Sequence, residues 1–330
     1  MKRYWNPIAI FVVTVLWAAA QPPRVRDINV YGLGKISKDR VLRAAKVRSG
    51  EPLPGSKGDM EDRMSEISGV ADARVEAVCC EGSEVHLFLG IEERGGPHVA
   101  FRSQPTADLA LANDLTAKYR EYSNEAHRAA YRGETPAGAS ERQQEFSAFA
   151  ESRLSELRQA LRDAADPEQR AIAAAVIAYA PKKTEILDDL QFALQDPDET
   201  VRNQALHALH DLVVQGVRDP SLGIRVSPTW LIELLNSLVL SDRVQATDIL
   251  LTLTDSRNSA ILEQIRVRAL PALAEMARWD TLTYALPPFL LLGRVAGIPE
   301  TEIQRLWSAG QREPVIDKAL GRPAGKSKGH

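Results

Sequence analysis

The chain has 330 residues, which is enough for two or three domains with cores of their own. Its 44% hydrophobic and 26% charged residues are typical of folded globular protein and exclude wholesale disorder. The formal net charge of −3 at pH 7 gives no overall attraction to nucleic acid or to an anionic membrane surface. Nucleic acid is therefore not an expected partner.

The first part of the chain, residues 1–20, has the layout of a secretory signal peptide. A positively charged start is followed by an apolar run over residues 8–17, shorter than the roughly 20 residues that span a bilayer. Ala18 and Ala20 are small residues at the positions that a signal peptidase inspects, so cleavage is expected before Gln21. We expect an exported, periplasmic protein. The alternative is an uncleaved segment, which would be the protein's only membrane contact.

The segment 24–94 predicts a small α+β domain of order β-α-α-β-β. Ile28 and Val30 alternate with polar neighbours, which indicates a half-buried strand. Gly32 and Gly34 follow it, and we interpret them as the turn that lets the first helix fold back on the sheet. Two helices and then two strands are expected next, over residues 40–47, 56–68, 71–80 and 83–93.

The same segment resembles a polypeptide-transport-associated (POTRA) domain. "VRDINVYGLGKISKDRVLRAA" is similar to its first strand, glycine turn and first helix, and "SGEPL" to the turn between its helices. "GVADARVEAV" and "SEVHLFLGIEE" are similar to its closing hairpin. The resemblance implies an envelope domain that binds other polypeptides, often by adding a strand to a sheet edge.

Cys79 and Cys80 are adjacent in an expected strand, where neighbouring side chains point to opposite faces. A bond between them would need strained geometry. We therefore expect one buried and one exposed thiol, or an intermolecular bridge in an oxidising compartment.

The rest of the chain predicts helices only. "GGP" at residues 95–97 begins a linker over residues 95–103. A long helix is expected from about residue 106 to 131 and a second from Ser140 to Ala164. Together they predict a helical hairpin within residues 104–164.

Repeats follow the hairpin. "DPEQRAIAAAVIAYAP" at 166–181 and "DPDETVRNQALHALHDL" at 196–212 share an Asp-Pro start and an arginine, and "SDRVQATDILLTL" at 241–253 is a weaker copy. They resemble HEAT repeats, in which an Asp-Pro turn and a Val-Arg pair open a helix; Val201-Arg202 matches best. We expect an all-α solenoid over residues 165–320, in which Asp caps each repeat helix.

The end of the solenoid is expected to diverge from the repeat beyond about residue 255. Pro271 would interrupt one helical run there, and Pro287-Pro288 would begin another after a break. Residues 321–330 are expected to be a disordered tail.

No residue set has the pattern of an active site. The nucleophile-elbow and zinc-protease motifs are absent, and His207 and His210 have no further ligand at metal spacing on their helix. Glu92 and Glu93 alternate faces at a strand end, so we expect both to be solvated. No cofactor, metal or small-molecule substrate is expected. A catalytic set scattered through the helical part is the enzyme alternative.

The sequence therefore favours a non-enzymatic exported scaffold that binds envelope polypeptides through its sheet and its helical repeats. The strand over residues 71–80 is expected at a sheet edge, with Arg74, Glu76 and Val78 as partner contacts. Phe88 lies with Val78 on the sheet face away from the helices, and that face either packs on the helical region or binds a partner. The alternative is an adaptor whose solenoid does all the binding, with the small domain as a spacer.

Overall fold

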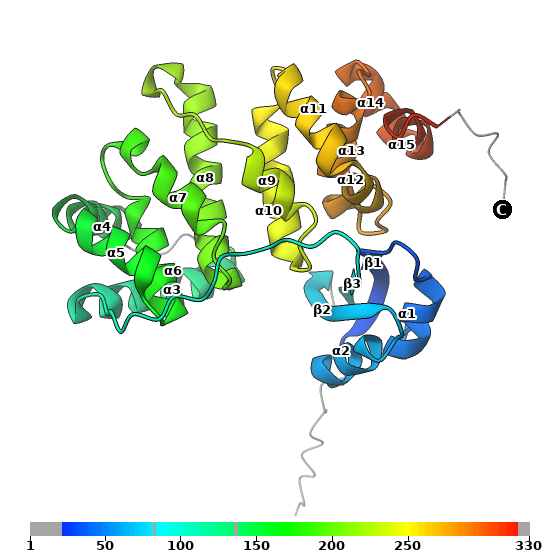
Figure 1. Ribbon diagram of the computed structural model, residues 1–330, viewed down its shortest axis with the longest axis horizontal. Coiled ribbons are helices and arrows are strands. Elements are labelled where there is room, and N and C mark those ends of the chain that lie inside the picture. The colour runs from blue at the N-terminus through cyan, green and yellow to red at the C-terminus, as the bar shows by residue number, and fades with distance from the viewer. Residues whose placement is uncertain (1–21, 82–83, 135–137, 323–330) are drawn as a thin grey trace, which may run out of the picture.

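The computed structural model describes residues 22–81, 84–134 and 138–322. A small α+β domain precedes a row of helices that forms a repeat solenoid, and its sheet packs against the C-terminal part of that row (Figure 1). The expected signal peptide and residues 323–330 of the expected tail lie outside the described residues. Among the described residues, no helix is long and apolar enough to cross a membrane.

The N-terminal domain has the predicted order of elements. Its elements are β1 (Arg24–Tyr31), α1 (Lys38–Ala45), α2 (Lys57–Ser65), β2 (Val70–Glu81) and β3 (Glu84–Glu93). The strands lie in the order β1-β3-β2, with β1 parallel and β2 antiparallel to β3. β2 therefore lies at an edge of the sheet, as the sequence predicts.

The two helices cover one face of this sheet. Their buried side chains, such as Val41 and Met64, pack with Val75, Leu87 and Leu89 from β2 and β3. The central strand β3 is buried on both faces, because the solenoid covers the other one.

The glycine turn after β1 depends on Gly32. Its φ is +80°, and a Cβ added there would lie 1.9 Å from the carbonyl oxygen of Ile91. The turn is closed by Glu93, whose carboxylate accepts the backbone N–H groups of Gly34 (2.7 Å), Lys35 (2.8 Å) and Ile36 (2.8 Å). Burial opposes the charged form, yet these N–H groups hold the pKa of Glu93 below its usual range. Glu93 therefore has a structural role in the turn, which the expectation of a solvated carboxylate did not include.

Replacement of the two turn glycines should have different consequences. We expect Gly32→Ala to reduce the free energy of unfolding by about 2 kcal/mol or more, because it combines a strained φ with a backbone clash. Gly34→Ala should cost less than about 1 kcal/mol, because its Cβ would meet only the flexible Glu93 side chain, at 3.3 Å. Urea denaturation of both variants measures the difference. Equal losses would contradict this account of the turn.

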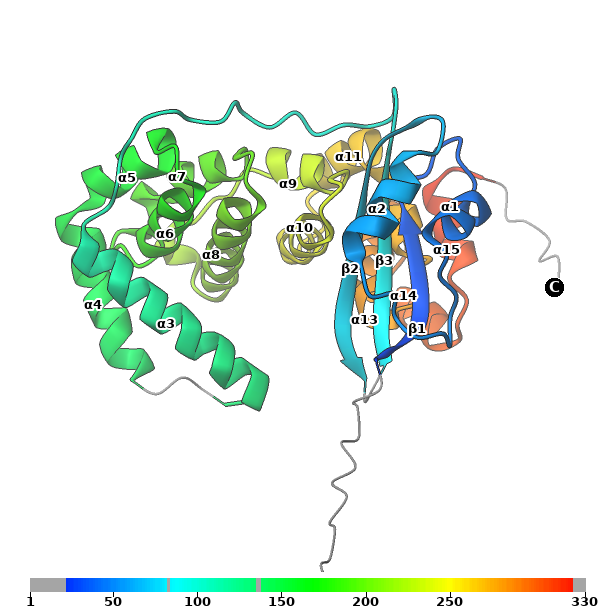
Figure 2. The same ribbon diagram turned by 90° about the horizontal axis from the view of Figure 1, so that it is seen from below.

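The solenoid is built from helix pairs that share one core. The inner helices α6, α8, α10 and α13 pack side by side, and each also packs on the helix before it (Figures 1 and 2). The helices are α3 (Asn113–Arg132), α4 (Ala139–Ser152), α5 (Leu154–Asp163), α6 (Pro167–Ile177), α7 (Leu187–Ala193), α8 (Glu199–Arg218), α9 (Thr229–Leu234), α10 (Leu240–Leu253), α11 (Ser259–Arg268), α12 (Leu270–Met276), α13 (Leu282–Val295), α14 (Glu300–Ser308) and α15 (Glu313–Ala319).

Several predicted boundaries were wrong. The first long helix begins at Asn113 rather than near residue 106, and the next stretch is divided at Arg153 into α4 and α5. Pro287 and Pro288 lie inside α13 instead of starting it. Burial of Pro288 and its neighbour Phe289 holds that helix together despite the lost hydrogen bonds.

The predicted linker over residues 95–103 is exposed as far as His98 and packs on the solenoid from Val99. Residues 99–112, here called the strap, run extended along the row of helices (Figures 1 and 2). Val99 and Leu111 are buried in the solenoid core. Backbone hydrogen bonds fix the strap between them, since Arg102 N–H donates to Gln195 (2.9 Å) and Ala107 N–H to Asp163 (3.1 Å). The strap therefore ties the first repeats to the sheet domain.

Candidate functional site

The sheet face away from α1 and α2 packs on the solenoid. Phe88 of β3 is fully buried there, with its ring centroid 5.2 Å from that of Trp279 and 5.4 Å from that of Tyr284. Tyr31, also fully buried, lies 5.9 Å from Trp279. Of the two alternatives that the sequence leaves open for Phe88, the structure shows packing within the chain and not an open surface.

Polar contacts fix the register of this interface. The Asn29 side-chain amide donates to the Thr281 hydroxyl at 2.7 Å, and its oxygen Oδ1 accepts the backbone N–H of Asp280 at 2.7 Å. The Thr281 hydroxyl in turn donates to Asp27 at 2.7 Å, and Asp27 lies 2.8 Å from Nδ1 of His86. Because each group has a defined partner, the sheet has one favoured position on the helices.

A row of buried arginines connects the inner helices; we call it the arginine ladder. Arg170 on α6, Arg202 on α8 and Arg243 on α10 each donate to backbone carbonyls five or six residues upstream, in the turn before their own helix. The acceptors are the carbonyls of Ala164, Ala165, Asp196, Pro197 and Ser237. Each arginine thus holds one inter-helix turn.

Each arginine also reaches an acid further along the chain. Arg170 binds Asp196 through two hydrogen bonds of 2.9 Å, and Arg202 binds Asp242 at 2.8 and 3.0 Å. Both carboxylates are completely buried. Burial raises the pKa of Asp242, against the opposing effect of the Arg202 guanidinium. The ladder therefore fixes the spacing between consecutive inner helices.

The two Asp-Pro motifs serve different purposes. Asp166 caps α6 as predicted, because its carboxylate accepts the N–H of Glu168 at 2.9 Å. The cap of α8 is Asp198, which accepts the N–H of Thr200 at 2.8 Å, so the prediction that Asp196 is the cap was wrong. Asp196 instead serves the ladder.

The last arginine of the ladder meets the N-terminal domain. The Arg243 guanidinium lies 4.7 Å from the ring centroid of Tyr31 and 3.7 Å from the Glu275 carboxylate. Glu275 accepts the N–H groups of Gly32 (2.8 Å) and Leu33 (3.2 Å), while burial raises its pKa against the effect of Arg243. The glycine turn therefore also docks the domain.

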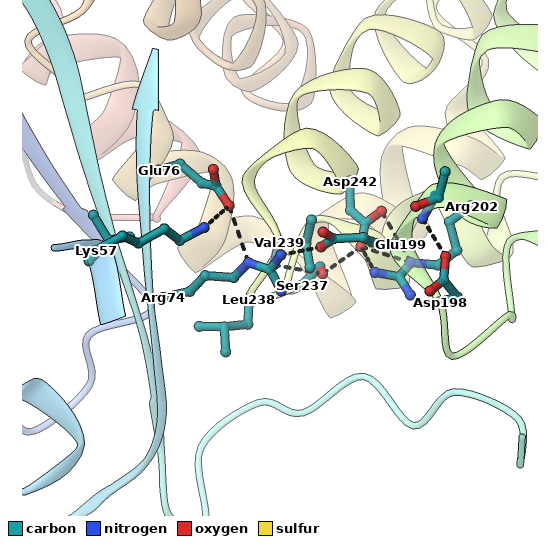
Figure 3. Close-up of polar contacts among 12 residues, drawn as sticks. Lys57, Arg74, Glu76, Asp198, Glu199, Arg202, Ser237, Leu238, Val239 and Asp242 are labelled. Atoms are coloured by element: carbon teal, nitrogen blue, oxygen red, sulfur yellow. Dashed lines mark hydrogen bonds and ion pairs between the residues drawn. The ribbon is translucent and has the colours of Figure 1, made fainter. Parts of the chain in front are cut away.

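A second ionic contact joins β2 to α8 (Figure 3). Arg74 forms an ion pair with Glu199 and lies 3.2 Å from Glu76, which also binds Lys57 at 3.1 Å. Two of the predicted partner contacts, Arg74 and Glu76, are thus tied into contacts within the chain. Val78 packs beside them against the interface core.

The concave side of the molecule is bounded by α3, the inner helices and the edge of β2 (Figure 2). Two cavities lie there, and His207 of α8 borders both. The first, the edge pocket, has a volume of about 400 Å³ and lies beside Glu76 and Val78 of β2. The second, the tyrosine pocket, has about 540 Å³ and is lined by residues that include Tyr119, Tyr122 and Tyr179.

Only part of the β2 edge is open. The Glu61 carboxylate accepts the outward N–H of Val75 at 2.8 Å, and Asp72 accepts that of its neighbour Ala73 at 2.8 Å. Because backbone N–H groups alternate direction along a strand, Ala77 also points its N–H away from β3, and this residue is exposed. The edge is therefore open at Ala77, next to the edge pocket.

The sequence also singled out the cysteines, a histidine pair and the residues around the expected cleavage site. Cys79 is disulfide-bonded, so the expectation of a free thiol at this position was wrong. Within the part of the chain that the structure describes, no group of three His, Cys, Asp or Glu residues could hold a metal ion, and this includes the surroundings of His207 and His210. Ala18, Ala20 and Gln21 lie outside the described residues.

Comparison with known proteins found a family match within the helical part of the chain. The HEAT-repeat family matches residues 154–222. A designed armadillo repeat protein is 20% identical, over 55% of this chain and 85% of its own, with a TM-score of 0.36. A computationally designed armadillo repeat protein for modular peptide recognition is 17% identical, over 63% of this chain and 96% of its own, with a TM-score of 0.37. No curated protein sequence matches the chain.

The matched repeats and the stacked helix pairs define the class of this protein: it contains a helical-repeat solenoid. Folds of this class present long surfaces to partners and depend on contacts between neighbouring repeats.

Loss of one arginine of the ladder should destabilise the solenoid strongly. We expect Arg202→Ala to cost about 3–5 kcal/mol, because the fully buried Asp242 would lose its counter-ion. The double variant Arg202→Met, Asp242→Leu should cost less than the single one, since no unpaired charge remains. Chemical denaturation followed by circular dichroism measures both.

The matched control is Arg305→Ala, which breaks an exposed pair with Glu302 and should change stability little. A double variant as unstable as Arg202→Ala would show that the buried charge pair is not the source of the effect.

Proposed function

We propose that this protein is a non-enzymatic scaffold that binds other polypeptides on its concave side, with the open edge of β2 as the principal contact. The observation that carries the proposal is the position of that edge: β2 is an edge strand of the sheet, the N–H of Ala77 points outward from it, and the strand borders a cavity shared with the solenoid. A strand edge binds an extended segment through backbone hydrogen bonds, and neighbouring pockets select its side chains.

Blocked and open parts of the same edge support this assignment. Glu61 and Asp72 occupy the N–H groups of Val75 and Ala73, which protects this half of the strand from unwanted pairing. The half that borders the edge pocket begins at the exposed Ala77. Arg74 and Glu76 then act as supports that hold β2 against α8, and Val78 is the predicted residue best placed to touch a partner.

The edge can be tested with a proline at Ala77. Ala77→Pro removes the outward N–H, so capture of the partner should fall sharply while the fold is kept, because edge strands tolerate proline. Ala77→Val keeps the N–H and is the matched control. The readout is in-cell photo-crosslinking from Ser241, which is exposed and lines the edge pocket, with mass spectrometry of what is captured. Equal capture by both variants would reject the strand edge.

A proline at Glu76 would be the wrong test. The N–H of Glu76 points toward β3, where this residue pairs with Phe88, because it alternates with the outward N–H of Val75. Proline there would break the sheet itself.

The second candidate function is an adaptor in which the solenoid does all the binding. The tyrosine pocket favours it, because all of its lining residues belong to the helical part. Isolated fragments cannot separate the two candidates cleanly, since the strap and the buried interface join both parts. Photo-crosslinking from the exposed Gln143 in the tyrosine pocket is the better test. Capture there that is lost in Tyr122→Ala and unchanged in Ala77→Pro would favour the solenoid-only adaptor.

We also propose that the scaffold acts in the cell envelope after export. Support comes from the sequence, where a charged start, an apolar run and Ala18 and Ala20 precede Gln21. The POTRA-like order of elements in residues 24–94 is consistent with such a location.

Export predicts a mature chain that begins at Gln21, because the signal peptidase would cut after Ala20. Intact-mass measurement of the protein from the periplasmic fraction checks this. Ala20→Arg is the control variant and should block the cut. An unprocessed chain in the membrane fraction would favour the retained segment, and an unprocessed chain in the cytoplasm would reject export.

A further inference from the structure

We infer that the edge pocket is the specificity pocket of the β2 edge: it accepts one apolar side chain of the strand that pairs there. This inference rests on the proposed function and adds what kind of segment the scaffold selects. The occupant is an extended segment of another polypeptide that carries a branched aliphatic or aromatic residue at one fixed position.

The side chains of β2 alternate in direction along the strand. Even-numbered residues of β2 face the solenoid, since Arg74 pairs with Glu199 and Val78 packs into the interface core. Residues directly opposite each other on paired strands point to the same face of a sheet. A residue placed opposite Val78 on an added strand therefore points toward α8 and α10.

A side chain in this position would enter the edge pocket. The edge pocket lies between β2 and the inner helices, and its volume of about 400 Å³ suits a large side chain. Its apolar lining residues are Val78, Val239, Leu240, Val244 and Tyr284. Most of them are only partly buried in the free protein, so an apolar side chain placed there would remove additional surface from water.

The charged groups of the edge pocket determine whether it favours a cation or an apolar side chain. The pocket also contains Glu76 and Glu199, which alone would favour a cation. Arg74 pairs with both of them, and Glu76 binds Lys57 as well. His207, which also lines the pocket, is disfavoured as a cation, because partial desolvation lowers its pKa. With its acids paired in this way, the pocket favours an apolar side chain over a charged one.

The test is a selection of random peptides displayed on phage against the full chain and against Val244→Trp, which narrows the pocket. Val267→Trp is the matched control, since Val267 is 74% exposed on α11 and outside the pocket. Peptides from the wild-type selection should share one large apolar position, and should bind Val244→Trp about tenfold more weakly or worse. Their affinity for Val267→Trp should be unchanged.

Each of the other outcomes would overturn a defined part of the proposal. Enriched peptides that bind Ala77→Pro poorly but have no fixed apolar position would overturn the pocket and leave the strand edge standing. Enriched peptides that bind Ala77→Pro as well as wild type would overturn the edge, and with it the proposed function. A failure to enrich any peptide would overturn both. A stable dimer that Ala77→Pro dissociates would identify the occupant as a second copy of this chain and overturn the inference of a foreign segment.

Discussion

The structure depends on how its buried guanidinium groups are paired. A charge removed from water is costly unless it is both paired and hydrogen-bonded, so Arg170 and Arg202 are stable in the core only while the turn before them and the acid beyond them stay in place. Arg243 has a different environment: its counter-charge is Glu275, at 3.7 Å, and the ring of Tyr31 lies against its guanidinium group. Repeat stacking and domain docking are therefore parts of one polar network.

This coupling gives the concave side a defined geometry. The strap fixes the first repeats, the arginine ladder fixes the inner helices, and the buried contacts of Phe88 and Asn29 fix the sheet. A binding site between elements that are held in this way loses little conformational entropy when a ligand binds. The edge of β2 and the pocket beside it are thus positioned together before any partner arrives.

The sequence predicted the local elements better than their association. Alternation identified β2 and β3, and the repeated Asp-Pro and arginine identified the solenoid, because these signals arise from residues near each other in the chain. The strap was not predicted, since its extended form comes from distant carbonyls such as those of Asp163 and Gln195. The arginine ladder did leave a signal, an arginine in each repeat followed by a later acid, but its pairing needs the fold.

The docked face of the sheet shows most clearly why association was not foreseen. His86, Phe88 and Gly90 alternate with the core residues of β3, a pattern equally compatible with an open binding face. Gly90 is explained only by the structure, because a Cβ there would lie 2.7 Å from the ring of Tyr31. Once the solenoid covers this face, a partner strand has no access to it. Binding through this sheet is then left to its edges, and the edge at Ala77 borders a cavity that lies between β2 and the inner helices α8 and α10.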